Sequence, residues 1–245
     1  MMDTNEFDAA VVAAVFTQAG LLGWRDTSLV DAARDAELDL ARLRVRFPSK
    51  TAVLLRFGVM ADQAALAAIP TTGTPRDRLF DAVMARFDQL QAHRDGVLAL
   101  MEALRFDPAT ALLLYGATLR SMKWMLEGAA IPAQGVVGQL RIHGLLAVWT
   151  YALRAWERDE GSDLPATMAA VDRALDRALQ AEALIPFNRV AEPPTAEPLP
   201  SDSLPEDTTA SDDLDPAPTT SSAPSSPTLL SGPDVTATPG GPRVI

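Results

Sequence analysis

Three arginines at alternate positions, followed closely by a lysine, are the side chains of this sequence best suited to bind a ligand by charge. The stretch RLRVRFPSK contains Arg42, Arg44, Arg46 and Lys50. An arginine can bond bidentately to O6 and N7 of guanine, whereas a lysine holds a phosphate as a point charge. The stretch therefore has the chemistry of a nucleic-acid contact. The alternative is a solvated helix face whose arginines pair with Asp35 and Asp39.

Residues for catalysis or metal binding are scarce. The chain has no cysteine, which excludes disulfides, thiolate zinc sites and cysteine nucleophiles. The two histidines, His93 and His143, fall in different predicted helices and belong to no HExxH pattern. A Gly-rich phosphate loop is also missing. We therefore expect a protein that is not an enzyme and that has no catalytic residue, no metal site and no cofactor.

The composition changes near residue 190 and divides the chain. Residues 190–245 contain twelve of the 19 prolines, nine acidic side chains and one basic one. Such a segment has too little apolar surface to offset the entropy lost on ordering, so we predict a disordered acidic tail. The tail is either a solvating segment or an arm that binds a partner or a basic surface. It carries most of the net charge of −11, so the acidic pI says little about what the rest binds.

The N-terminal sequence lacks a basic region followed by an apolar run, and no stretch reaches the roughly 18 apolar residues of a membrane span. We expect a cytoplasmic protein without a membrane span. Up to about residue 189 the apolar residues recur at helical spacings of three and four, so the fold class is all-α. The first helices are predicted at 6–20, 26–36 and 39–46, and a fourth begins at Lys50 after the stop at Pro48. Asp39 and Ser49 are the predicted caps of the third and fourth helices.

The third predicted helix separates its apolar side from its arginines. Leu40, Leu43 and Phe47 share one side at spacings of three and four. Arg42 and Arg46 then share a face, and Arg44 points elsewhere.

Residues 7 to 57 resemble the N-terminal domain of TetR-family transcriptional regulators. The resemblance rests on GLLGWRDTSLVDAARDAELDLARLRVRFPSKTAVL, which has a Gly-aromatic turn, a Thr-Ser start of the second helix, a short recognition helix and a Phe-Pro-Ser-Lys corner, in that order. It implies a helix-turn-helix DNA-binding domain over 1–60 and a helical domain for ligand binding and dimerisation over 61–189. The implied protein is a homodimer on double-stranded DNA that a small apolar effector releases.

The same resemblance assigns roles to single residues. It makes 39–46 the recognition helix and implies the following contacts: Arg42 and Arg44 with guanine, Arg46 with the DNA backbone, Thr27 and Ser28 beside a phosphate, and Lys50 on a phosphate. One departure lies in the corner between the second and third helices. The family favours a small residue there, often glycine, where this chain has Glu37, which neither takes a positive φ easily nor attracts a phosphate.

Residues 61–189 contain further apolar helices. We predict one or two helices over 74–104 and one each over 107–131, 136–161 and 164–185. The helix over 136–161 and the last one carry enough apolar surface for a four-helix dimer interface. Large side chains are either packed core or the lining of an effector pocket. The predicted lining comprises Met101, Leu104, Tyr115, Leu119, Met122, Trp124, Met125, His143, Trp149 and, less centrally, Met168.

A second resemblance covers the C-terminal half. The stretch LLAVWTYALRAWERDEGSDLPATMAAVDRALDRA is similar to the COQ9 family, whose members share the TetR-like fold but bind lipids and assist ubiquinone biosynthesis. This implies an alternative in which tryptophan and methionine side chains hold an isoprenoid or acyl chain. A dimer without a ligand would explain neither the Phe-Pro-Ser-Lys corner nor the arginines.

Overall fold

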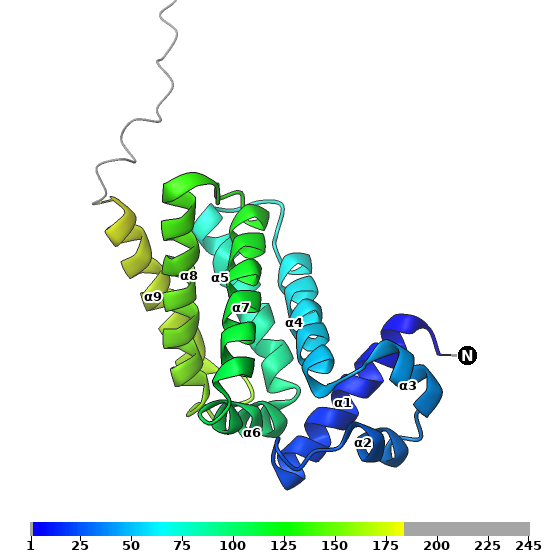
Figure 1. Ribbon diagram of the computed structural model, residues 1–245. Coiled ribbons are helices and arrows are strands. Elements are labelled where there is room, and N and C mark those ends of the chain that lie inside the picture. Colours follow the sequence, from blue (N-terminus) through cyan, green and yellow to red (C-terminus); the bar gives the residue numbers. More distant parts are fainter. Residues whose placement is uncertain (1, 184–245) are drawn as a thin grey trace, which may run out of the picture. The chain divides into compact units, whose positions relative to one another are not determined.

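The computed structural model describes residues 2–183, which form nine α-helices and no strand (Figure 1). This confirms the all-α prediction for that range. The predicted tail, 190–245, lies outside the described residues. None of the helices in residues 2–183 is long and apolar enough to cross a membrane.

The first helices begin at side chains that cap their free backbone N–H groups. They are α1 (Thr4–Leu22), α2 (Leu29–Asp35), α3 (Leu40–Arg46) and α4 (Lys50–Ala67). Asp3 and Glu6 form a capping box at α1, and Ser28, Asp39 and Ser49 each accept a backbone N–H at the start of α2, α3 and α4. Such caps contribute about 1 kcal/mol each and fix where a helix begins. The caps predicted at Asp39 and Ser49 are confirmed.

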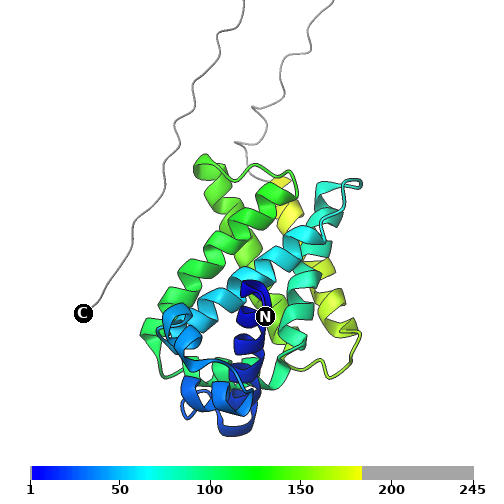
Figure 2. The ribbon, with the colours of Figure 1, turned by 90° about the vertical axis from the view of Figure 1, so that its right-hand side faces the viewer.

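Five further helices form a bundle with α4, which connects this bundle to the first three helices (Figure 2). They are α5 (Pro75–Gln91), α6 (Arg94–Leu104), α7 (Pro108–Gly128), α8 (Gly135–Trp156) and α9 (Pro165–Ala183). The segment 74–104 is thus a pair of helices. The break allows α6 to cross α1 at Gly96, where a Cβ would overlap the carbonyl oxygen of Phe16.

A charged pair lies inside the bundle. The side chain of Arg86, on α5, is 8% exposed and forms an ion pair with Asp62 of α4. The Ser121 hydroxyl of α7 donates to the other carboxylate oxygen over 2.7 Å, and the ring of Trp149 lies 5.1 Å from the guanidinium. Burial lowers the pKa of Arg86 to about 10, which still leaves it cationic at neutral pH. The pair therefore joins three helices through a buried charge.

Glu37, in the corner between α2 and α3, adopts the left-handed conformation with φ 53°. The Leu38 N–H donates to the Ala33 carbonyl over 2.8 Å, and the Glu37 N–H donates to that of Arg34 over 3.0 Å. This is the Schellman arrangement that ends many helices, usually with glycine at the left-handed position. The corner thus has the backbone geometry that usually requires glycine, although a glutamate occupies the position.

We predict that Glu37→Gly raises the free energy of unfolding by roughly 0.5–1 kcal/mol. Relief of the left-handed strain gives about 1–2 kcal/mol, and the greater freedom of glycine in the unfolded chain removes part of it. Urea denaturation followed by circular dichroism measures the change. Glu37→Ala is the control, because it removes the charge but keeps the Cβ. An equal gain in both variants would mean that the charge, and not the backbone, carries the effect.

Candidate nucleic-acid interface

The recognition helix predicted at 39–46 is α3, and it is anchored through one side. Leu43 and the following Phe47 are buried. Its outward face carries Arg44 and Val45, with Val45 89% exposed. Val45 was not predicted as a site residue, although its position two residues after Leu43 already puts it off the apolar side.

Arg42 is held by the N-terminus of the chain. Its guanidinium donates to the carbonyl oxygens of Met2 and Asp3 over 2.9 and 2.8 Å. It also lies 4.2 Å from the ring centre of Phe7. These contacts tie the first turn of α3 to the start of α1.

Arg46 is held by a buried carboxylate. It donates two hydrogen bonds to Asp8 of α1, over 2.9 and 2.7 Å, and Arg56 of α4 lies 2.6 Å from the same carboxylate. The side chain of Asp8 is fully buried. Asp8 was missed from the sequence, yet it precedes Val12 by four residues and so lies on the buried face of α1, where a charge needs a partner.

Hydrogen bonds from Arg46, together with the charges of Arg46 and Arg56, lower the pKa of Asp8 below its ordinary value. Its charged form therefore stabilises the fold above about pH 4, and this contribution is lost as the pH falls through the lower pKa of the folded state. The alternative partners Asp35 and Asp39 are not used by Arg46. Asp39 instead caps α3 by accepting the Arg42 N–H over 2.6 Å.

We predict that Asp8→Asn lowers the free energy of unfolding at pH 7 by roughly 1.5–3 kcal/mol, because hydrogen bonds to a charged group are lost. The difference from the wild type shrinks below about pH 4, where Asp8 is protonated in the unfolded chain, and vanishes once the pH falls below the lower pKa of Asp8 in the folded protein. Denaturation curves between about pH 2 and 7 measure both effects. Asp35→Asn, at an exposed position, should change little. A difference that stays constant down to about pH 2 would contradict the assignment to the Asp8 charge.

Lys50 lies against the turn between α1 and α2. Its ammonium donates to the carbonyl oxygens of Trp24 and Arg25 over 2.9 and 3.1 Å, and burial lowers its pKa. Thr27 is buried and its hydroxyl donates to the Gly23 carbonyl over 2.9 Å. The Ser28 hydroxyl accepts the Asp31 N–H at the start of α2. The structure thus brings Lys50 to the same turn as Thr27 and Ser28.

The residues predicted to line an effector pocket differ in burial. Met122, Met125 and Trp149 are packed in the core, and Trp149 stacks on Phe87 with ring centres 4.5 Å apart. Others are half-buried against the core, namely Met101, Leu104 and Leu119. The remainder are exposed, namely Tyr115, Trp124, His143 and Met168.

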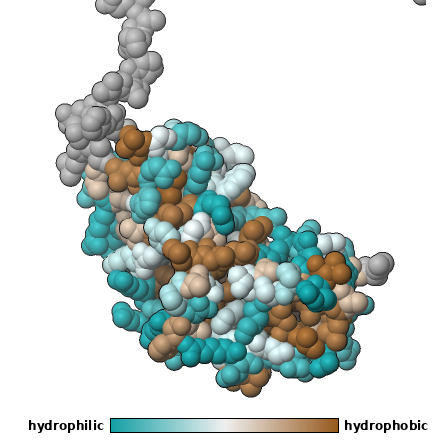
Figure 3. Space-filling view, in the orientation of Figure 1, coloured by the Kyte–Doolittle hydropathy of each residue, from teal (hydrophilic) through white to brown (hydrophobic). Residues whose placement is uncertain are grey.

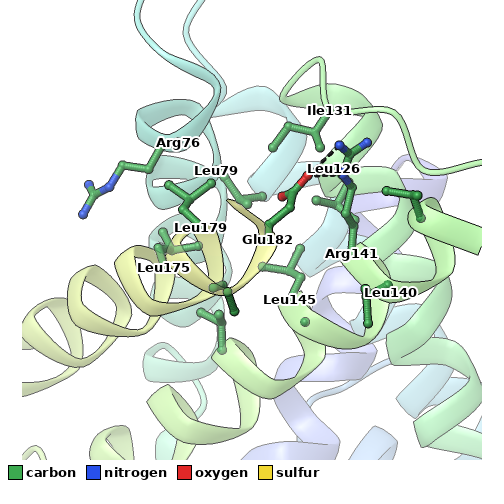
Figure 4. Close-up of a pocket in the computed structure, with 15 residues that line it drawn as sticks. Arg76, Leu79, Leu126, Ile131, Leu140, Arg141, Leu145, Leu175, Leu179 and Glu182 are labelled. Atoms are coloured by element: carbon green, nitrogen blue, oxygen red, sulfur yellow. Dashed lines mark hydrogen bonds and ion pairs between the residues drawn. The ribbon is translucent and has the colours of Figure 1, made fainter. Parts of the chain in front are cut away.

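An apolar cavity with a volume of about 180 Å³ lies between α5, the end of α7, α8 and α9 (Figure 4). None of the residues predicted for the pocket lines it. The difference has a physical reason. The apolar pattern of a helix tells which side faces the interior, but not where neighbouring side chains leave a gap.

Exposed apolar side chains gather on α7 and α8, and Figure 3 shows apolar areas on the face that these helices present. On α8 they are Val136, Leu140 and Tyr151, in line with His143 and Ala147. The predicted dimer interface combined α8 with the last helix, α9. On α9 the exposed side chains include the apolar Met168 and Leu179 as well as charges at Asp172, Arg173, Asp176 and Arg177.

Solved structures with a similar fold include two described as TetR transcriptional regulators. The regulator from Nitrosomonas europaea is 18% identical, with a TM-score of 0.58 over 71% of this chain and 98% of that chain. The regulator from Rhodococcus sp. RHA1 is 15% identical, with a TM-score of 0.50 over 72% and 98%. GusR of Salmonella enterica is 17% identical, with a TM-score of 0.52 over 74% and 98%.

No protein-family model and no curated protein matches the chain. The structural likeness therefore carries the classification, and at these identities it shows the fold. The TetR resemblance noted in RLRVRFPSK and its flanking helices is confirmed at that level: the chain has the fold of TetR transcriptional regulators.

Proposed function

We propose that the protein is a cytoplasmic transcriptional regulator without catalytic activity, which binds operator DNA as a homodimer and is released by a small apolar effector. In this proposal residues 1–60 bind DNA, and residues 61–189 bind the effector and dimerise. The observation that carries it is the outward face of α3. That face presents an arginine and an aliphatic side chain from a short helix fixed on its opposite side.

The contacts within the chain suggest different roles for the three arginines of α3. Arg44 is the arginine of α3 for which residues 2–183 provide no hydrogen bond or ion pair, so its guanidinium can bond to guanine without losing a partner. Val45 is placed to contact a thymine methyl group. Arg42 and Arg46 are already bonded, so we assign them to positioning α3.

Lys50 and Ser28 retain the capacity to bind a phosphate. An ammonium has three donors, and two of those of Lys50 go to carbonyl oxygens, which leaves one. The Ser28 hydroxyl accepts a bond at the cap, so its own proton remains to be donated. The Thr27 hydroxyl is buried and already donates to Gly23, so we assign it to the fold of the turn.

The spacing of exposed side chains on α8 supports the proposed dimer. Val136, Leu140, His143, Ala147 and Tyr151 recur at intervals of three and four along the whole exposed side of the helix. This is the pattern of a seam between packed helices. A second copy that covers α7 and α8 would bury it, and a twofold dimer suits two half-sites on one face of DNA.

The lipid-binding alternative is not favoured. The similar structures named above include two transcriptional regulators, and the cavity of about 180 Å³ is small for an isoprenoid chain. Mass spectrometry of apolar compounds that co-purify with the protein tests this alternative directly.

The test of the regulator proposal is enrichment of sheared genomic DNA from the source organism at moderate salt. The wild type is compared with the double variant Arg44→Ala, Val45→Ala, whose substitutions lie on the exposed face of α3 and leave the packing intact. We expect the wild type to enrich a discrete sequence and the variant to lose it. Enrichment of no sequence by the wild type would overturn the proposal.

A further inference from the structure

The cavity between α5, α8 and α9 has a hydrocarbon floor. Leu79, Leu126, Leu145, Val148 and Leu175 line it and are all buried. They come from four helices and converge on the same space (Figure 4). An apolar cavity of about 150 Å³ with such a lining stays free of water and binds benzene in another protein. The space in this chain is about 180 Å³, so it suits a molecule the size of one aromatic ring.

The charged side chains at the rim are already matched. Arg141 donates to Glu182 over 2.8 and 2.6 Å and to the Pro132 carbonyl over 2.9 Å. Arg76 pairs with Asp172 and Asp176 of α9, and Figure 4 shows it pointing away from the leucines. A charged ligand would lose its hydration without gaining a free counter-ion. The rim therefore selects for a neutral molecule.

The mouth of the cavity lies on the surface between α8 and α9. Leu140 and Leu179 line it and are partly exposed, and Gly144 lies beside them on α8. A Cβ added at Gly144 would meet no other atom within 4 Å. A larger side chain can therefore fill the mouth without displacing the helix.

We infer that this cavity is the effector site, and that its ligand is a neutral, hydrocarbon-like molecule about the size of a single aromatic ring. The inference rests on the proposed regulator function. The helix that forms one wall, α8, also carries the exposed seam assigned to the dimer. A ligand that separates α8 from α9 changes the placement of that seam, and it releases DNA to the extent that it binds the released form more tightly.

Toluene and benzoate are the probes, because they share a ring and differ in charge. Binding to the full chain is measured by isothermal titration in the absence of DNA. We expect toluene to bind at least tenfold more tightly than benzoate. Gly144→Leu should weaken toluene binding at least tenfold, whereas Gly58→Leu, on α4 and equally open to a Cβ, should stay within twofold of the wild type. Thermal unfolding of both variants checks that they are folded.

The inference fails if toluene does not bind, if Gly144→Leu binds it as well as the wild type does, or if benzoate binds better. It also fails if bound toluene leaves the affinity for the enriched duplex unchanged. If toluene binds but the protein enriches no DNA, the ligand site is supported and the regulator function is overturned. The two failures are therefore distinguishable.

Discussion

Replacing Asp62 with alanine will lower the free energy of unfolding by about 3–5 kcal/mol, which is the usual cost of removing one partner of a buried ion pair. Arg86 remains cationic at neutral pH, and without Asp62 its charge has no counter-ion in the bundle. The Ser121 hydroxyl loses its carboxylate acceptor as well. Urea denaturation at pH 7, followed by circular dichroism, measures the loss.

The matched variant removes both charges. Asp62→Leu combined with Arg86→Met leaves no unpaired charge, so we expect it to be far closer to the wild type than Asp62→Ala is. Asp81→Ala, at an exposed position on α5, should change stability by less than about 0.5 kcal/mol. A double variant less stable than Asp62→Ala would contradict the assignment, because the pair would then stabilise through its packing.

Replacing Arg44 with alanine will weaken binding to the enriched duplex by about 1–3 kcal/mol, or roughly 5- to 150-fold, and will relax the preference at one base pair. The reason is the loss of the bidentate contact with guanine that we propose for Arg44. Arg42→Ala should act differently, because Arg42 bonds to Met2 and Asp3. It should lower the stability of the fold more than it changes the preference at any single base pair. Fluorescence anisotropy on duplexes with each base pair replaced in turn measures both effects.

Arg34→Ala serves as the control for charge, because Arg34 is exposed on α2 and pairs only with its helix neighbour Asp31 in the described residues. It removes one positive charge from the same three-helix unit without touching α3. Equal weakening by Arg34→Ala and Arg44→Ala, with no change in base preference, would assign Arg44 to general electrostatic attraction.

Local sequence signals were enough to predict where α3 ends and where α3 and α4 begin. Asp39 and Ser49 were recognised as caps, and Pro48 as a stop, because each acts on residues a few positions away. The buried positions of Leu43 and Phe47 followed from their spacing. Each of these features is determined by residues only a few positions away, so it can be predicted from a single sequence.

The partners of the arginines could not be predicted in the same way. Arg46 bonds to Asp8, which is 38 residues distant, and periodicity shows only which face each residue occupies. Glu37 was expected to resist a positive φ, yet the hydrogen bonds of the corner hold it there. A local preference of about 1 kcal/mol gives way when the surrounding helices fix the turn.

The cavity between α5, α7, α8 and α9 depends on the fold as a whole. Its floor combines Leu79, Leu126 and Leu175, from helices far apart in the sequence. A gap among such side chains arises from the angles and offsets at which helices pack, and these are not local properties. Tryptophan and methionine residues were predicted to line the pocket because they are apolar and methionine adapts to irregular shapes, whereas Met122, Met125 and Trp149 are buried in the core.

The most direct test of the central claim, that α3 reads DNA, compares the affinity of the full chain for the enriched duplex and for a scrambled duplex of the same composition. Both are measured between about 50 and 200 mM salt. We predict a preference for the enriched sequence of at least about 10³-fold, with both affinities falling steeply as salt rises. Equal affinity for the two duplexes, or none for either, would contradict a reading role for Arg44 and Val45.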